Sequence, residues 1–141
     1  AYNIIHNLQS KVLSLERDYE IKARDLKLLN MGLRHVSKLE FAEGTEMLEP
    51  YALEYLYNLD TLVLPSTIKV IPSYSLFSYS IKTIYCKAQH PPQLDFFAFG
   101  ENREVPSLTI YIPKGSIKEY IEIWKERESH KTFKLIECLS L

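Results

Sequence analysis

The most regular feature of the chain is a spacing of apolar residues that occurs three times. The pattern apolar-x-x-apolar-x-apolar occurs at residues 36–41, 59–64 and 81–86. Its central residues Leu39, Leu62 and Ile84 follow one another at intervals of 23 and 22 residues. In the first two units, further apolar residues recur at matching intervals: Leu48, Leu53 and Leu56, then Ile71, Leu76 and Tyr79. A fixed period of this length indicates a repeat architecture.

The third unit departs from the period by about one residue. Its Ala98-Phe99 matches Ala52-Leu53 and Ser75-Leu76 with a displacement, and we place the insertion within residues 89–92. Residues 108–112 alternate apolar and polar side chains, which predicts a fourth strand.

Burial explains why such units must stack, because one strand with its return segment cannot cover its own apolar edge. The pattern therefore predicts an α/β fold, a short leucine-rich-repeat solenoid of about 3–4 parallel strands, spaced about 4.8 Å apart. The expected inward residues are Leu39, Phe41, Leu62, Leu64, Ile84, Cys86, Ile110 and Ile112. Phe96, Phe97 and Phe99 are expected to thicken this core.

The repeats occupy residues 34–113, and residues 114–141 have the pattern of a C-terminal cap. Ser116 and Glu119 have the S-x-x-E spacing of a capping box at the start of a helix. The helix is expected to end near residues 127–128, and a short closing strand follows at residues 133–136. One stripe of the helix would carry Ile117, Tyr120, Ile121 and Trp124.

Residues 1–33 form a separate N-terminal segment with helical periodicity. Its apolar residues recur at intervals of three and four, interrupted by Lys22: Ile5, Leu8, Val12, Leu15, Tyr19, Leu26, Leu29 and Leu33. A helix from Tyr2 to Leu29 would be about 42 Å long, whereas four strands span only about 15–20 Å. Two arrangements fit this mismatch. The helix bends or splits and caps the repeats, or residues 1–30 pair with a second chain as a coiled coil and form a homodimer.

Composition narrows the classes of function. Hydrophobic residues make up 46% of the 141 residues and charged residues 25%, as in ordinary globular domains. The formal net charge is −1, so the chain lacks the excess of positive charge that is typical of a nucleic-acid-binding protein. No apolar run approaches the roughly 20 residues of a transmembrane helix. The two cysteines, Cys86 and Cys138, fit buried thiols or, in an exported protein, a single disulfide.

Candidate chemistry is sparse along the chain. The four histidines, His6, His35, His90 and His130, lack metal-ligand or triad spacing. The stretch Lys114-Gly115-Ser116 precedes a helix, as anion sites do, but lacks the full phosphate-loop pattern and is expected to be a structural turn. Glu43 and Glu46 resemble solvated turn residues. We expect no catalytic activity, no metal and no cofactor.

The outward residues of the strands form the candidate binding face. Side chains alternate along a strand, so the residues flanking each inward position face out. They form two columns. The first is Lys38, Thr61, Thr83 and Thr109, and the second is Glu40, Val63, Tyr85 and Tyr111. Tyr85 and Tyr111 would lie close together and could anchor a protein or glycan.

Three stretches resemble the BspA-like (treponemal-type) leucine-rich repeats. Residues 64–71, LPSTIKVI, are similar to the LPxSlxxI stretch of that family, and residues 85–92, YCKAQHPP, to its last repeat. Residues 111–116, YIPKGS, followed by Tyr120 and Trp124, are similar to its terminal segment. The chain departs from the family where Leu53 and Leu76 replace the usual phenylalanine.

The resemblance implies a bacterial protein, cell-surface or secreted, with an adhesion-like role. On this basis the sequence predicts noncatalytic recognition of a host or extracellular macromolecule. The alternative is a structural assembly module that dimerises through its N-terminal helix.

Overall fold

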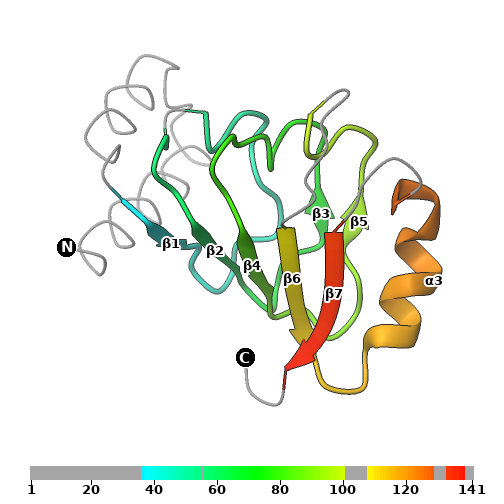
Figure 1. The fold of residues 1–141 in the computed structure, drawn as a ribbon. Helices are drawn as coiled ribbons and strands as arrows, with labels where there is room; N and C mark the ends of the chain where they lie inside the picture. Colours follow the sequence, from blue (N-terminus) through cyan, green and yellow to red (C-terminus); the bar gives the residue numbers. More distant parts are fainter. Residues whose placement is uncertain (1–35, 55, 101–107, 129–132, 139–141) are drawn as a thin grey trace.

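The computed structural model describes residues 36–54, 56–100, 108–128 and 133–138. These residues form a parallel-strand β-solenoid of about four turns. The larger sheet contains, in spatial order, β1 (Lys38–Glu40), β2 (Thr61–Leu64), β4 (Thr83–Cys86), β6 (Leu108–Pro113) and β7 (Phe133–Cys138). A smaller sheet pairs β3 (Val70–Ile71) with β5 (Gln93–Leu94), and Met47 forms a parallel bridge to Val70. Figure 1 shows the larger and the smaller sheet as separate parts of the solenoid, with helix α3 (Ile117–Glu128) beside β7.

The predicted inward columns form the core. The register pairs Leu39 with Leu62, Leu62 with Ile84, and Ile84 with Ile110. These four side chains are at most 1% exposed, as are Phe41, Leu64, Cys86 and Ile112. Alternation along each strand, combined with a constant register, therefore buries every inward position that the sequence pattern identified.

The expected thickening of the core by three phenylalanines is correct only for Phe99, which is buried. Phe96 and Phe97 are more than half exposed. Phe97 has a left-handed backbone, with φ of 60°, so the chain reverses direction there. Ala98 and Phe99 then point into the core, and Phe97 lies on the outside of the turn.

Tyr79, expected at an apolar core position, is also exposed. The position that Leu56 occupies in the first unit is taken by Ser78 in the second, because Leu59 and Ile81 are 22 residues apart. The buried Ser78 hydroxyl accepts hydrogen bonds from the backbone N–H groups of Ser80 and Ile81, both at 3.3 Å. This one-residue shortening places Tyr79 outside.

Helix α3 packs against the C-terminal end of the solenoid through two buried aromatic residues. The Tyr120 hydroxyl donates a hydrogen bond to the Ala88 carbonyl at 2.6 Å, and the Trp124 Nε1–H donates to the Pro92 carbonyl at 2.8 Å. Tyr120 and Trp124 lie on the predicted stripe, whereas Ile121, also predicted there, is exposed. Buried Tyr120 and Trp124 and partly buried Ile117 form a narrow arc on the core side of the helix, and Ile121 lies beyond its edge.

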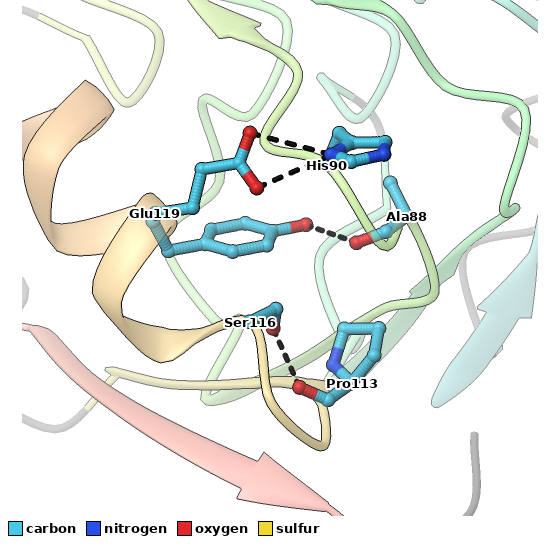
Figure 2. A network of polar contacts seen from close by, with 6 residues as sticks. Ala88, His90, Pro113, Ser116 and Glu119 are labelled. Carbon is cyan, nitrogen blue, oxygen red and sulfur yellow. Dashed lines mark hydrogen bonds and ion pairs between the residues drawn. The ribbon is translucent and has the colours of Figure 1, made fainter.

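The predicted capping box does not form. The Ser116 hydroxyl donates to the Pro113 carbonyl, and the Glu119 carboxylate contacts His90 Nδ1 at 3.2 Å (Figure 2). The Ile117 N–H at the start of the helix instead donates to the Glu137 carboxylate of β7 at 3.0 Å. The helix end near residue 128 and the closing strand are as predicted, although β7 extends to Cys138.

Several predictions fall outside the described residues. They are the N-terminal helical segment 1–33, dimerisation through residues 1–30, and the positions of His6, His35 and His130.

Candidate binding face

The register brings the predicted outward residues together on the five-stranded sheet. Lys38, Thr61, Thr83 and Thr109 form one row across the strands, and Glu40, Val63, Tyr85 and Tyr111 form the other. The pairing of β6 with β7 extends the first row to Lys134 and the second to Ile136. These last two residues were not predicted, because β7 follows a helix and lies outside the repeat.

Tyr85 and Tyr111 are the central pair of the second row. Their rings stack with centroids 5.0 Å apart and planes inclined by 16°, and both side chains are half-buried. Val63 and Ile136 lie on either side of the pair, so that an apolar row crosses four strands over about 14 Å. Ile136 at the end of this row is 41% exposed.

An ion pair crosses the sheet at the other end of this row. The Lys87 ammonium lies 3.7 Å from the Glu40 carboxylate, and β2 lies between their two strands. Val63, the residue of β2 that pairs with Glu40, is only 5% exposed despite facing outward. Lys87 was not predicted because it follows the strand. Its position two residues after Tyr85 is the sequence signal for the outward face.

The threonine row has a different character. Thr61, Thr83 and Thr109 are half-buried, while Lys38 and Lys134 at the two ends are exposed. Cross-strand threonines stabilise a sheet while leaving polar atoms on its surface. The face therefore combines an apolar row with a parallel polar row that has a cationic residue at each end.

The carboxylates Glu43 and Glu46 connect consecutive turns of the solenoid. Glu43 accepts hydrogen bonds from the Ser66 hydroxyl at 2.6 Å and from the Ser66 N–H at 3.0 Å. The Ser66 hydroxyl bond is the main cause that lowers the pKa of Glu43. Glu46 lies 3.1 Å from the Lys69 ammonium. Both carboxylates therefore have a structural role, because each contacts a residue of the next solenoid turn.

The stretch Lys114-Gly115-Ser116 precedes a helix, as anion sites do. The Glu137 carboxylate already occupies the start of the helix, where an external anion would bind. Among the described residues, no group of three or more His, Cys, Asp or Glu side chains is arranged to hold a metal ion.

The two cysteines are both thiols. Cys86 is fully buried, and burial raises the pKa of its thiol. Its sulfur lies 3.3 Å from the Tyr120 hydroxyl oxygen. Since Tyr120 donates its own hydrogen to Ala88, the Cys86 S–H is the donor in this contact. The thiol is thus part of the attachment of α3 to the last turn.

These features define a class, a parallel β-solenoid with one mixed polar and apolar sheet face. The sequence matches no protein-family model, and comparisons with curated proteins and with solved structures also give no match. Within the described part of the chain, no helix has the length and apolar character needed to span a bilayer.

Proposed function

We propose that the chain is a noncatalytic binding module of a bacterial cell-surface or secreted protein. It recognises a host or extracellular macromolecule through the outward face of the five-stranded sheet. The observation that carries the proposal is the stacked pair of Tyr85 and Tyr111 in the centre of that face. The two tyrosines hold each other in place before any ligand binds, which lowers the entropy cost of using them as anchors.

The resemblance to BspA-like leucine-rich repeats supports the same proposal. The motif residues Tyr120 and Trp124 donate hydrogen bonds to the carbonyls of Ala88 and Pro92, which belong to the second motif. Two of the three stretches that carry the resemblance therefore contact each other. A leucine-rich-repeat module in this family implies an adhesion-like role, and the binding face provides a surface for it.

The experiment is an array of host matrix proteins and glycans probed with the purified chain and with a Tyr85→Ala/Tyr111→Ala variant. Loss of two central aromatic anchors is expected to weaken a genuine interaction by about tenfold or more. The matched control is Ile121→Ala/Ile123→Ala, which removes two exposed apolar side chains from α3. Binding retained by the tyrosine variant, or an array without any hit, would contradict the proposal.

A further inference from the structure

A second ordered row of aromatic residues lies on the turns that follow the smaller sheet. Tyr51, Tyr74 and Phe97 are spaced 23 residues apart, and each has a left-handed backbone, with φ of 60°, 64° and 60°. The Tyr51 N–H donates to the Tyr74 carbonyl at 3.1 Å, and the Tyr74 N–H donates to the Phe97 carbonyl at 2.8 Å. Left-handed backbone is disfavoured for aromatic residues, so these bonds hold an unusual arrangement in register.

The side chains of this row extend into a larger aromatic surface. The Tyr51 and Tyr74 rings stack at 5.2 Å, Tyr74 contacts Phe77 at 6.4 Å, and Phe77 contacts Tyr79 edge-on at 5.0 Å. Phe96 lies beside Phe97, with ring centroids 6.4 Å apart. We call these six residues the aromatic turn ladder. Four of the six are exposed, Tyr51, Tyr79, Phe96 and Phe97, with a fraction that reaches 82% at Tyr79, whereas Tyr74 and Phe77 are half-buried. Clusters of exposed apolar side chains mark interaction sites.

The three turn segments that carry the ladder contain charged residues of one sign. The turn segments 49–54, 72–79 and 95–100 contain three acidic residues, Glu49, Glu54 and Asp95, and no lysine or arginine. Glu49 and Glu54 are exposed and belong to the same turn as Tyr51, because the Ala52 N–H donates to the Glu49 carbonyl and the Glu54 N–H to the Tyr51 carbonyl. Aromatic faces and carboxylates both attract cations.

We propose that the aromatic turn ladder binds a cationic polypeptide segment. Arginine or lysine side chains of the partner lie over the rings, and Glu49 and Glu54 pair with neighbouring positive charges. Three turns of the solenoid repeat the aromatic position over about 10 Å. An extended chain presents side chains on one face about every 6.8 Å, so a peptide engages more than one turn at once. This surface is separate from the sheet face and does not depend on the function proposed for it.

The test measures fluorescence anisotropy of labelled nona-arginine titrated with the purified chain. Nona-glutamate and a glycine-serine peptide of equal length serve as ligand controls. We expect a Tyr51→Asn/Tyr79→Ser variant to weaken nona-arginine binding about tenfold, because asparagine tolerates the left-handed backbone while removing the ring. Glu49→Gln/Glu54→Gln is expected to weaken it about threefold or more at low salt. Tyr85→Ala/Tyr111→Ala should leave it unchanged.

Several outcomes would overturn the proposal. One is equal binding of nona-arginine to the wild type, to Tyr51→Asn/Tyr79→Ser and to Glu49→Gln/Glu54→Gln. Another is comparable binding of nona-glutamate. A third is a dimer in light scattering that becomes monomeric in the ladder variant, which would assign the ladder to a second copy of the chain. If Tyr51→Asn/Tyr79→Ser does not melt cooperatively, the surface glutamate variant decides, since it changes charge without changing any ring.

Discussion

The five-stranded sheet and the aromatic turn ladder both repeat aromatic residues from one solenoid turn to the next, but they do so on different backbones. Tyr85 and Tyr111 lie on extended strands and are half-buried. Tyr51 and Tyr74 have left-handed backbones, and Tyr51 is 44% exposed. The ring separations are nevertheless nearly equal, at 5.0 Å in the sheet and 5.2 Å in the turns.

Register alone is therefore enough to align aromatic side chains. In the sheet, the buried column of Leu39, Leu62, Ile84 and Ile110 fixes the register. In the turns, backbone hydrogen bonds between consecutive turns fix it, one from Tyr51 to Tyr74 and two from Tyr74 and Leu76 to Phe97 and Ala98. The sheet residues thus depend on the core beneath them, whereas the turn residues depend on local backbone geometry.

The largest expected effect comes from the core that supports both regions. Leu62→Ala removes a side chain with no exposed surface and should lower the free energy of unfolding by about 2–5 kcal/mol. Thr61→Ala, on the outward face of the same strand, should cost less than about 1 kcal/mol. Urea denaturation measures both values. Equal losses would show that the two faces of β2 do not differ in burial.

The next effect concerns the backbone of the turns. Gly100 has φ of +96°, and a Cβ added there would lie 2.5 Å from Phe77 Cδ2. Gly44 has φ of +99°, with no atom within 4 Å of such a Cβ. Gly44→Ala should therefore show only the cost of left-handed backbone, about 1–2 kcal/mol. Gly100→Ala should cost about 1 kcal/mol more, because the Phe77 ring must move.

The same pair of variants tests the link between Gly100 and the aromatic turn ladder. Displacement of Phe77 should change the near-ultraviolet circular dichroism of Gly100→Ala but leave that of Gly44→Ala close to wild type. An identical loss of stability and an unchanged spectrum in both variants would contradict the contact between Gly100 and Phe77.

The strands of the larger sheet were predictable from the sequence, and the reason is physical, whereas the smaller sheet of β3 and β5 was not predicted. Period-two alternation specifies which side of a strand is buried, and the 22–23-residue interval specifies which strands are neighbours. Both columns of the candidate binding face follow from these two facts. Lys134 and Ile136 did not follow, because β7 reaches the sheet only after helix α3.

The turns were less predictable, because apolar character does not specify direction where the backbone reverses. Phe97 and Phe99 are the same residue type two positions apart, and only the left-handed φ at Phe97 separates exposed from buried. The return segment before β4 is one residue shorter than the one before β2, so Ser78 takes the buried position and the Tyr79 side chain is exposed. The capping box failed because the Ser116 hydroxyl and N–H both donate to the Pro113 carbonyl, and the Glu119 carboxylate contacts His90. Glu137, 20 residues after Ile117, accepts the N–H at the helix start.

A smaller difference in stability is expected between variants of the two stacked tyrosine pairs, Tyr85 with Tyr111 and Tyr51 with Tyr74. Tyr111→Asn loses ring stacking worth about 0.5–1.5 kcal/mol and places a poor strand former in β6, so we expect a total loss of about 1–2 kcal/mol. Tyr51→Asn loses similar stacking but relieves left-handed strain of about 1 kcal/mol, because asparagine tolerates this backbone. Its stability should stay within about 1 kcal/mol of wild type. Thermal unfolding followed by circular dichroism measures both variants, and a larger loss for Tyr51→Asn would reverse the comparison.

The smallest expected effect is the pH dependence of the bond that joins two turns beside the sheet. The Ser66 hydroxyl bond lowers the pKa of Glu43 in the folded state below its value in the unfolded chain. Deprotonated Glu43 therefore contributes stability that is fully present above about pH 4–5 and is lost as the pH falls through the lower folded-state pKa. Because the carboxylate is largely exposed, solvent screening keeps this contribution small. Urea midpoints of wild type, Glu43→Gln, Ser66→Ala and the double variant, measured from neutral pH into the acid range, form a double-mutant cycle. The coupling between the two residues should be present at neutral pH and vanish in acid. A coupling that is independent of pH would mean that the Glu43 charge is not what holds Ser66.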